Sequence, residues 1–360
     1  MRTSEPIKRR EFIRSSALGA AAIGLGTPAF SSLAATPPPK KDSKLKVGLY
    51  SITYLGVWYN GNALTLDDII FKAKKLGFDG IEIDGKRPHG NPLDMPIKRC
   101  KEIKSKAEGE GLEIYAVSAN NDFSSPMPEF RECQIAYLRD LIRMTSDLGV
   151  KPLRVFLGWP GVTKHPQLAR YDIARDIWQY THYQFSAEET WNWCREGLIE
   201  CSKYATDYGV TLALQNHLPV INSWKDMVRM VEEVNSPNLK CCLDAPILED
   251  KSAENINEAS KTVGSMQVLT HFGGEYGRDT NGKIIDIMPY SNLTEKEKSV
   301  NSSLYPNFVK AMKDIGYSGY FSYELCHPLP IVNGHTVGIE FVDQCAGLAC
   351  EMMKGLINNV

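Results

Sequence analysis

The chain has 360 residues and a nearly balanced charge, with 41 Lys and Arg against 43 Asp and Glu, for a net charge of −2. This balance argues against a nucleic-acid partner, which would need a basic surface. The nine cysteines are odd in number and form no CxxC pair, so we expect buried free thiols rather than a disulfide framework.

Two adjacent arginines mark the N-terminal segment Lys8-Arg9-Arg10-Glu11-Phe12-Ile13-Arg14. An uncharged stretch rich in Ala, Gly and Leu follows from Ser15 to about Leu33, and it is too short and too weakly apolar for a transmembrane helix. Ser32-Leu33-Ala34 offers small residues for cleavage, and Pro37-Pro38-Pro39 is typical of a stiff spacer. The segment resembles bacterial twin-arginine signal peptides.

We therefore expect a signal peptide over residues 1–34, a linker over 35–45 and a periplasmic or otherwise exported domain over 46–360. An uncleaved N-terminal anchor is the alternative. Removal of residues 1–34 would take away five basic and two acidic residues and leave a net charge of −5. We expect no membrane association after cleavage.

Short apolar runs alternate with longer stretches of helical periodicity from residue 46 onward, at intervals of roughly 40 residues. The runs are continuous rather than alternating, which is typical of parallel strands buried on both faces. Eight such β/α units in succession predict an α/β fold, a single-domain (β/α)8 TIM barrel. The eight predicted strands are Lys46–Ser51, Gly80–Asp84, Glu113–Ser118, Leu153–Gly158, Thr211–Gln215, Leu239–Leu243, Met266–Phe272 and Gly319–Glu324.

Capping residues support the helices between these runs. Ser186 with Glu189 fits a capping box, and Ser223 with Asp226 fits a weaker one. Glycines such as Gly77 and Gly209 end a helical stretch just before the next strand, as expected for helix C-termini.

Two connections are longer than a barrel loop requires. Trp159 to Glu189 is rich in aromatic residues, and Gly273 to about Tyr305 is mostly polar. Both follow predicted strands, so both belong to the C-terminal face, where barrel enzymes place their sites. The aromatic connection either stacks on sugar rings, with Trp159 as a substrate contact, or packs as a small core of its own.

Polar residues gather where the last four predicted strands end, at Gln215, Asp244, His271 and Glu324. These ends are neighbours around a barrel, so we expect their side chains to converge at its mouth. Carboxylate, imidazole and amide donors together suit Mn²⁺, Co²⁺, Mg²⁺ or Zn²⁺.

From about Lys46 to the C-terminus the chain resembles the xylose-isomerase-like barrels, often called sugar phosphate isomerases/epimerases. The phrases that carry the resemblance are Gly80-Ile81-Glu82-Ile83, Leu212-Ala213-Leu214-Gln215-Asn216-His217 and Cys242-Leu243-Asp244. The resemblance implies a divalent metal bound by Glu, Asp, His and Glu at strands 5 to 8. Asp244, His271 and Glu324 match this set, whereas Gln215 stands where a carboxylate is usual.

Gln215 has chemical consequences, because an amide brings no charge to a metal and cannot accept a proton. We expect weaker metal binding and one-base chemistry, with Glu324 as the base that removes a proton α to a carbonyl. Glu82 and His217 compete for the base role. Further candidates for substrate contact, besides Trp159, are Asn216, Glu275, Arg278 and His327.

The leading hypothesis is a metal-dependent isomerase or epimerase for an unphosphorylated sugar or keto-sugar, since the chain has no Gly-rich phosphate loop and export argues against phosphorylated metabolites. A lyase or hydratase that acts on 3-keto-glycosides by β-elimination is the close alternative. A non-catalytic sugar-binding barrel is another. An abasic-site endonuclease is disfavoured by seven His and a negative net charge. The expected partner is a small carbohydrate, and a homo-oligomer stays open.

Overall fold

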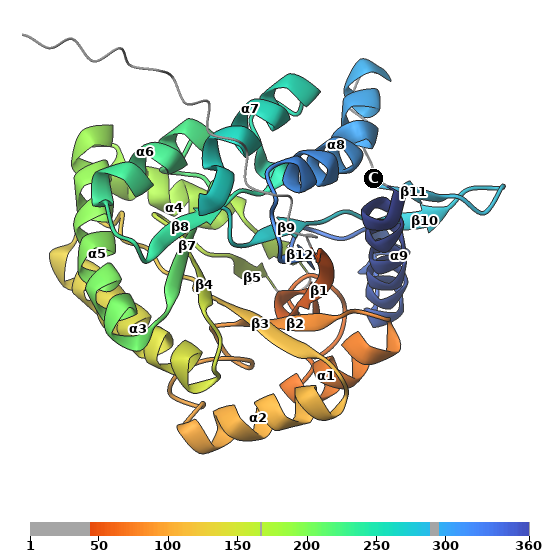
Figure 1. Ribbon diagram of the computed structural model, residues 1–360, viewed down its shortest axis with the longest axis horizontal. Coiled ribbons are helices and arrows are strands. Elements are labelled where there is room, and N and C mark those ends of the chain that lie inside the picture. Colours follow the sequence, from red (N-terminus) through yellow and green to blue (C-terminus); the bar gives the residue numbers. More distant parts are fainter. Residues whose placement is uncertain (1–43, 166–167, 289–294, 360) are drawn as a thin grey trace, which may run out of the picture. The chain divides into compact units, whose positions relative to one another are not determined.

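The computed structural model of the chain describes residues 44–165, 168–288 and 295–359. Eight parallel strands form the central sheet in the order β8-β7-β4-β3-β2-β1-β12-β9 (Figure 1). Each of the eight predicted runs overlaps one of them, so the predicted barrel is confirmed. The strands are β1 (Lys46–Tyr50), β2 (Gly80–Asp84), β3 (Glu113–Ser118), β4 (Pro152–Val155), β7 (Thr211–Gln215), β8 (Leu239–Cys242), β9 (Thr270–Phe272) and β12 (Tyr320–Tyr323).

The barrel is nearly closed between β8 and β9, where a single bridge joins Cys241 to Gln267. The predicted strand from Met266 is too long, because β9 begins only at Thr270. The Gln267 side chain accounts for the difference: its amide oxygen accepts from the Leu243 backbone N–H at 3.1 Å, in place of a ladder bond.

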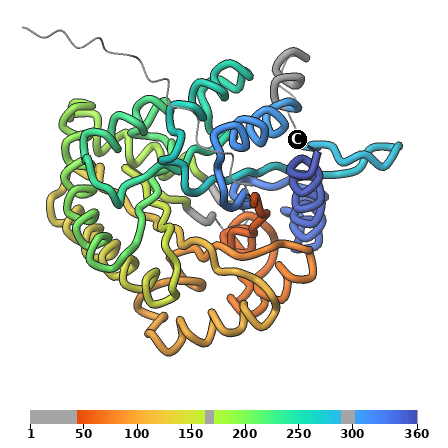
Figure 2. Tube along the Cα trace, in the orientation of Figure 1, coloured from red at the N-terminus to blue at the C-terminus, as the bar shows by residue number. Residues whose placement is uncertain are grey.

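Helices surround the sheet, and Figure 2 traces the chain around it until β12 returns beside β1. The capping boxes at Ser186 and Ser223 are both present, and Gly209 ends its helix in the left-handed conformation at φ 66°. The helices are α1 (Leu66–Lys75), α2 (Ile97–Gly109), α3 (Pro128–Asp147), α4 (Asp172–His182), α5 (Ala187–Tyr208), α6 (Trp224–Val234), α7 (Ala253–Val263), α8 (Glu295–Asp314) and α9 (Ile339–Asn359).

The two long connections contain secondary structure of their own. The aromatic one carries the hairpin of β5 (Thr163–His165) and β6 (Leu168–Arg170), followed by α4. The polar one carries the hairpin of β10 (Tyr276–Arg278) and β11 (Ile284–Asp286). This connection is shorter than predicted, because α8 already begins at Glu295. A third hairpin, β13 (Ile331–Val332) with β14 (His335–Thr336), follows β12. Short 3₁₀ turns lie at Ser51–Tyr54, Ala245–Ile247 and Gly264–Met266.

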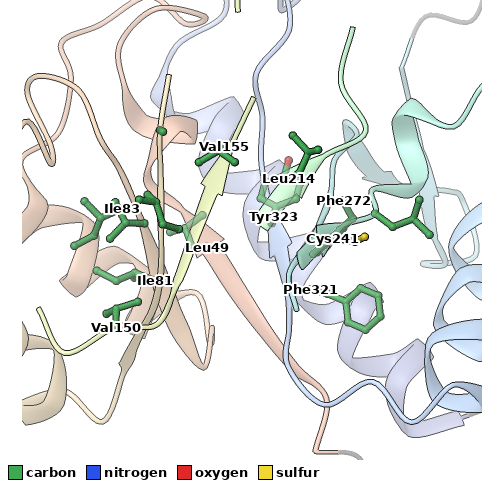
Figure 3. Close-up of a cluster of buried hydrophobic side chains, with 14 of the residues drawn as sticks. Leu49, Ile81, Ile83, Val150, Val155, Leu214, Cys241, Phe272, Phe321 and Tyr323 are labelled. Atoms are coloured by element: carbon green, nitrogen blue, oxygen red, sulfur yellow. The ribbon is translucent and has the colours of Figure 1, made fainter. Parts of the chain in front are cut away.

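Side chains alternate along each barrel strand, as the pleat requires. One set is apolar and packs between strands and helices; Leu49, Ile83, Leu214 and Phe321 belong to this core (Figure 3). The other set points into the barrel and is mostly polar toward the C-terminal strand ends, which we call the mouth. Buried polar residues in inward register are Glu82, Ser118, Arg154, Gln215, His271 and Ser322.

The opposite end of the barrel interior is filled by two stacked tyrosines. The rings of Tyr115 and Tyr320 lie 3.8 Å apart at an interplanar angle of 7°. Gly48 makes room for them, because a Cβ built there would lie 2.2 Å from the Tyr115 ring. The two rings therefore form the centre of a small buried cluster at the N-terminal end of the barrel interior.

The expected signal peptide and most of the linker lie outside the described residues. Within the described part of the chain, no helix has both the length and the apolar character that crossing a membrane would require.

Candidate functional site

Asp244 follows β8 and is the centre of a buried hydrogen-bond network at the mouth. One carboxylate oxygen accepts from the His271 backbone N–H at 2.7 Å, and the other accepts from His271 Nδ1 at 2.9 Å and from the Gln215 amide. Burial alone would raise the pKa of Asp244, but His271 and the other donors lower it below its usual range. Asp244 is therefore ionised.

His271, the middle residue of β9, faces a carboxylate with each ring nitrogen. Nδ1 lies 2.9 Å from Asp244 Oδ2, and Nε2 lies 3.0 Å from Glu82 Oε1. Burial lowers the pKa of His271, but the charges of Glu82 and Asp244 outweigh burial and raise it well above the usual value. Because neither carboxylate can donate, the ring carries both protons and a positive charge.

Glu82 of β2 is fully buried and accepts hydrogen bonds from three sides. Ser322 donates at 2.6 Å, Ser118 donates to the other oxygen, and His271 bridges both oxygens. Although burial raises the pKa of Glu82, His271 and the other donors lower it below the usual value. This geometry makes Glu82 an anchor for His271 and speaks against its expected role as the base.

Gln215 at the end of β7 lies between a cation and an anion. Its oxygen accepts from Arg154 Nη1 at 2.8 Å, and its nitrogen donates to Asp244. Arg154 of β4 also donates to Ser118 at 3.0 Å and to Tyr50 at 2.8 Å, and it is 3% exposed. A buried guanidinium therefore stands beside the position where the sequence departs from the family pattern.

Glu324 follows β12 and is the least constrained acid of the mouth. The residue is partly exposed, and its carboxylate has no hydrogen-bond or ion-pair partner among the described residues. Burial of the carboxyl group, together with Asp244 and Glu82, raises the pKa of Glu324, while His271 and Arg154 partly oppose this. A carboxylate of raised pKa without a partner suits general acid–base work.

Three buried donors come close enough to hold a metal ion, namely Cys242 Sγ, one Asp244 oxygen and one His271 ring nitrogen, all within 4.8 Å of one another. Imidazole, carboxylate and thiol donors fit a divalent transition ion. The set differs from the expected Gln215, Asp244, His271 and Glu324: Cys242 joins it, while Glu324 does not belong to this compact group.

An aromatic cluster lies over the mouth. Trp159 stacks on Phe156 at 5.0 Å and meets His217 edge-on at 5.3 Å and Tyr171 at 5.9 Å. His217 Nδ1 faces the Leu218 carbonyl, and burial lowers the pKa of His217 to about 4. His217 is therefore neutral near pH 7.

Of the other residues expected to contact substrate, Asn216 lies within the mouth network, whereas Arg278 lies outside it. Asn216 is buried and joins both backbone groups of Asp244, so it connects two strand ends. Glu275 is 2% exposed and pairs with His327 at 3.0 Å. Arg278 lies on β10 and pairs with Glu351 of α9 at 2.6 Å, so the structure does not bring it into the mouth network.

The sequence analysis did not predict Arg154 and Cys242 as site residues, although the sequence around each contains a feature that could have indicated it. Arg154 is a charge within the apolar run from Leu153 to Val155, and a buried charge needs partners. Cys242 lies two residues before Asp244, so both point to the same side of an extended chain.

A family model described as xylose isomerase-like TIM barrel matches residues 70–345. The chain belongs to this family. No curated protein matches the chain significantly.

Solved structures of the same fold also match this member of the xylose isomerase-like family. D-psicose 3-epimerase from Clostridium cellulolyticum H10 is 22% identical, with a TM-score of 0.61 over 87% of this chain and 99% of the other. L-ribulose 3-epimerase is 18% identical, with a TM-score of 0.58 over 87% and 95%. The 3-keto-D-glucoside 4-epimerase from E. coli is 17% identical, with a TM-score of 0.55 over 85% and 99%.

Proposed function

We propose that the protein is an isomerase- or epimerase-type enzyme that acts on an unphosphorylated sugar or keto-sugar. The observation that carries the proposal is the unpartnered, partly exposed Glu324 carboxylate beside the Asp244–His271 network at the barrel mouth. The sugar epimerases named among the similar structures support the substrate class.

We propose Glu324 as the base that removes a proton from the carbon next to the sugar carbonyl. Its raised pKa keeps the proton available for delivery, on the same face, to the neighbouring carbon, which completes an isomerisation. Trp159 and the neutral His217 would cover the sugar and exclude water. Glu82 accepts from His271 Nε2 at 3.0 Å and so holds the imidazole ring in a fixed orientation beside Asp244.

A divalent ion would be held by Asp244, His271 and Cys242, with Zn²⁺ and Co²⁺ favoured over Mg²⁺ by the nitrogen and sulfur donors. When bound, such an ion acts as a Lewis acid that stabilises negative charge on sugar oxygens. Loading requires His271 to release the proton that it shares with Asp244.

The second candidate is a lyase or hydratase acting on 3-keto-glycosides. Gln215 favours it, because an amide on β7 leaves no acid opposite Glu324 to reprotonate the other face, as inversion of a carbon would require. Elimination needs one base and a leaving group, and isomerisation needs one base that returns the proton to a neighbouring carbon.

The test is solvent exchange in D₂O over a panel of keto-sugars and 3-keto-glycosides, with metal-free protein and with Zn²⁺, Co²⁺ or Mn²⁺ added. Deuterium in recovered sugar supports the isomerase, and release of an aglycone supports the lyase. Binding without exchange in any sugar would refute both and leave a sugar-binding barrel. The variant E324Q should abolish exchange while sugar binding persists.

We also propose that the domain is exported by residues 1–34, on the strength of Arg9-Arg10. Fractionation of cells that express the full chain and the double variant R9K/R10K tests this. Equal amounts of mature protein outside the cytoplasm for both chains would refute it.

A further inference from the structure

Gln215 can offer only one atom to a cation, its amide oxygen, and Arg154 already holds that atom. The guanidinium has donors and no acceptor, so the Gln215 atom 2.8 Å from Nη1 must be the oxygen. The amide nitrogen is thereby directed at Asp244. A half-turn of the amide would set its NH₂ against the guanidinium and an oxygen against a carboxylate.

Arg154 cannot easily release Gln215, because its own position is fixed from several sides. Nε donates to Ser118, Nη2 donates to Tyr50, and the guanidinium carbon lies 4.1 Å from the centre of the Phe156 ring. Tyr50 is fixed in turn by Asp84 at 3.2 Å. The guanidinium is also permanently charged, so it repels a second cation at any working pH.

We propose that Arg154 is a positioning residue that clamps Gln215 as a hydrogen-bond donor to Asp244 and thereby keeps β7 out of the ion's coordination. The protein then carries its own fixed cation next to a weakly held, exchangeable divalent ion. This inference rests on the metal-dependent part of the proposed function.

If the clamp exists, the effect of Q215E on Mn²⁺ affinity should depend on whether Arg154 is present. A simple count of charges would predict no such dependence. In Q215E the new carboxylate should pair with Arg154, so Mn²⁺ affinity should rise less than about threefold. In R154M the Gln215 oxygen becomes free, and affinity should rise about tenfold. In R154M/Q215E the carboxylate meets the ion unopposed, and the gain should exceed the product of the two single effects.

Isothermal titration of Mn²⁺ into the metal-free full chain measures these affinities without reference to turnover. Co²⁺ absorption reports in parallel whether an additional oxygen enters the coordination sphere in R154M. The variant R154Q removes the charge and keeps a polar side chain, so it replaces R154M if the latter does not fold. R195M, which removes an arginine of α5 paired with Glu233, should leave the affinity within about twofold of wild type.

Failure of the Arg154–Gln215 clamp can be distinguished from failure of the metal site. Mn²⁺ binding by the wild type with no gain in R154M or R154Q would overturn the clamp and leave the metal site standing. An equal gain from Q215E with and without Arg154 would also overturn it. Absence of Mn²⁺ binding in the wild type and in every variant would overturn the clamp and the metal site together.

Discussion

Glu82→Gln removes one charge from the mouth and changes almost nothing in size. Glu82 is 0% exposed and is the only partner of His271 Nε2 among the described residues, at 3.0 Å. Its loss leaves a buried imidazolium with one carboxylate instead of two, and breaking a buried pair on one side costs about 3–5 kcal/mol. We expect a drop of this size in the free energy of unfolding, measured by urea denaturation of the metal-free protein.

A matched control is Glu351→Gln, which removes the partner of Arg278 on the surface, where the two side chains are 45% and 57% exposed. An exposed pair contributes about 0–1 kcal/mol, so this variant should denature almost like the wild type. A loss below about 1 kcal/mol in E82Q would refute the role of Glu82 as an anchor for His271.

The same network gives this stability a defined dependence on pH. The pKa of His271 is raised on folding, so its contribution is complete below about 6.5 and is lost as the pH rises through the raised value. The pKa of Glu82 is lowered, so its contribution is complete above about 4.3 and is lost as the pH falls. The difference between wild type and E82Q should therefore be largest between these limits, and a larger difference at pH 9 than at pH 5.5 would contradict this reasoning.

Three further substitutions test individual side chains. Glu324→Gln should lower kcat/KM about 10²- to 10⁴-fold on any sugar that is turned over, and the wild-type rate should rise with pH through the raised pKa of Glu324 rather than near the usual value for glutamate. Cys242→Ser should weaken Zn²⁺ binding about 10- to 100-fold in a competition titration and affect Mn²⁺ much less, whereas equal losses would exclude a sulfur ligand. Asn216→Ala should cost about 1–3 kcal/mol of stability with sugar affinity retained, and the reverse result would restore Asn216 as a substrate contact.

The barrel could be predicted from the sequence because its strands are local, continuous apolar runs separated by capped helices. The strand at Met266 was placed too early because the sequence could not reveal that the Gln267 side chain replaces a backbone partner. The two long connections resembled loops because their strands have only three residues each, too few for a periodic signal.

At the site, sequence reasoning correctly brought Gln215, Asp244 and His271 together, because neighbouring parallel strands end at the same edge. It could not show which neighbour each polar group would bond. Glu82 competes for the base role in the sequence because the apolar run around it gives no sign of the three hydrogen-bond donors that other strands bring to it. Arg278 was assigned by its distance along the chain from His271, whereas the β10–β11 hairpin carries it to α9.

The stacked pair of Tyr115 and Tyr320, with Gly48 beside it, fills the N-terminal end of the barrel interior. We therefore expect a sugar that reaches Glu324 to enter and leave at the mouth of the barrel. Product and substrate would then share one opening, and a bound product would exclude the next substrate from the mouth. If the protein turns over a sugar, added product should therefore act as a competitive inhibitor in a steady-state assay.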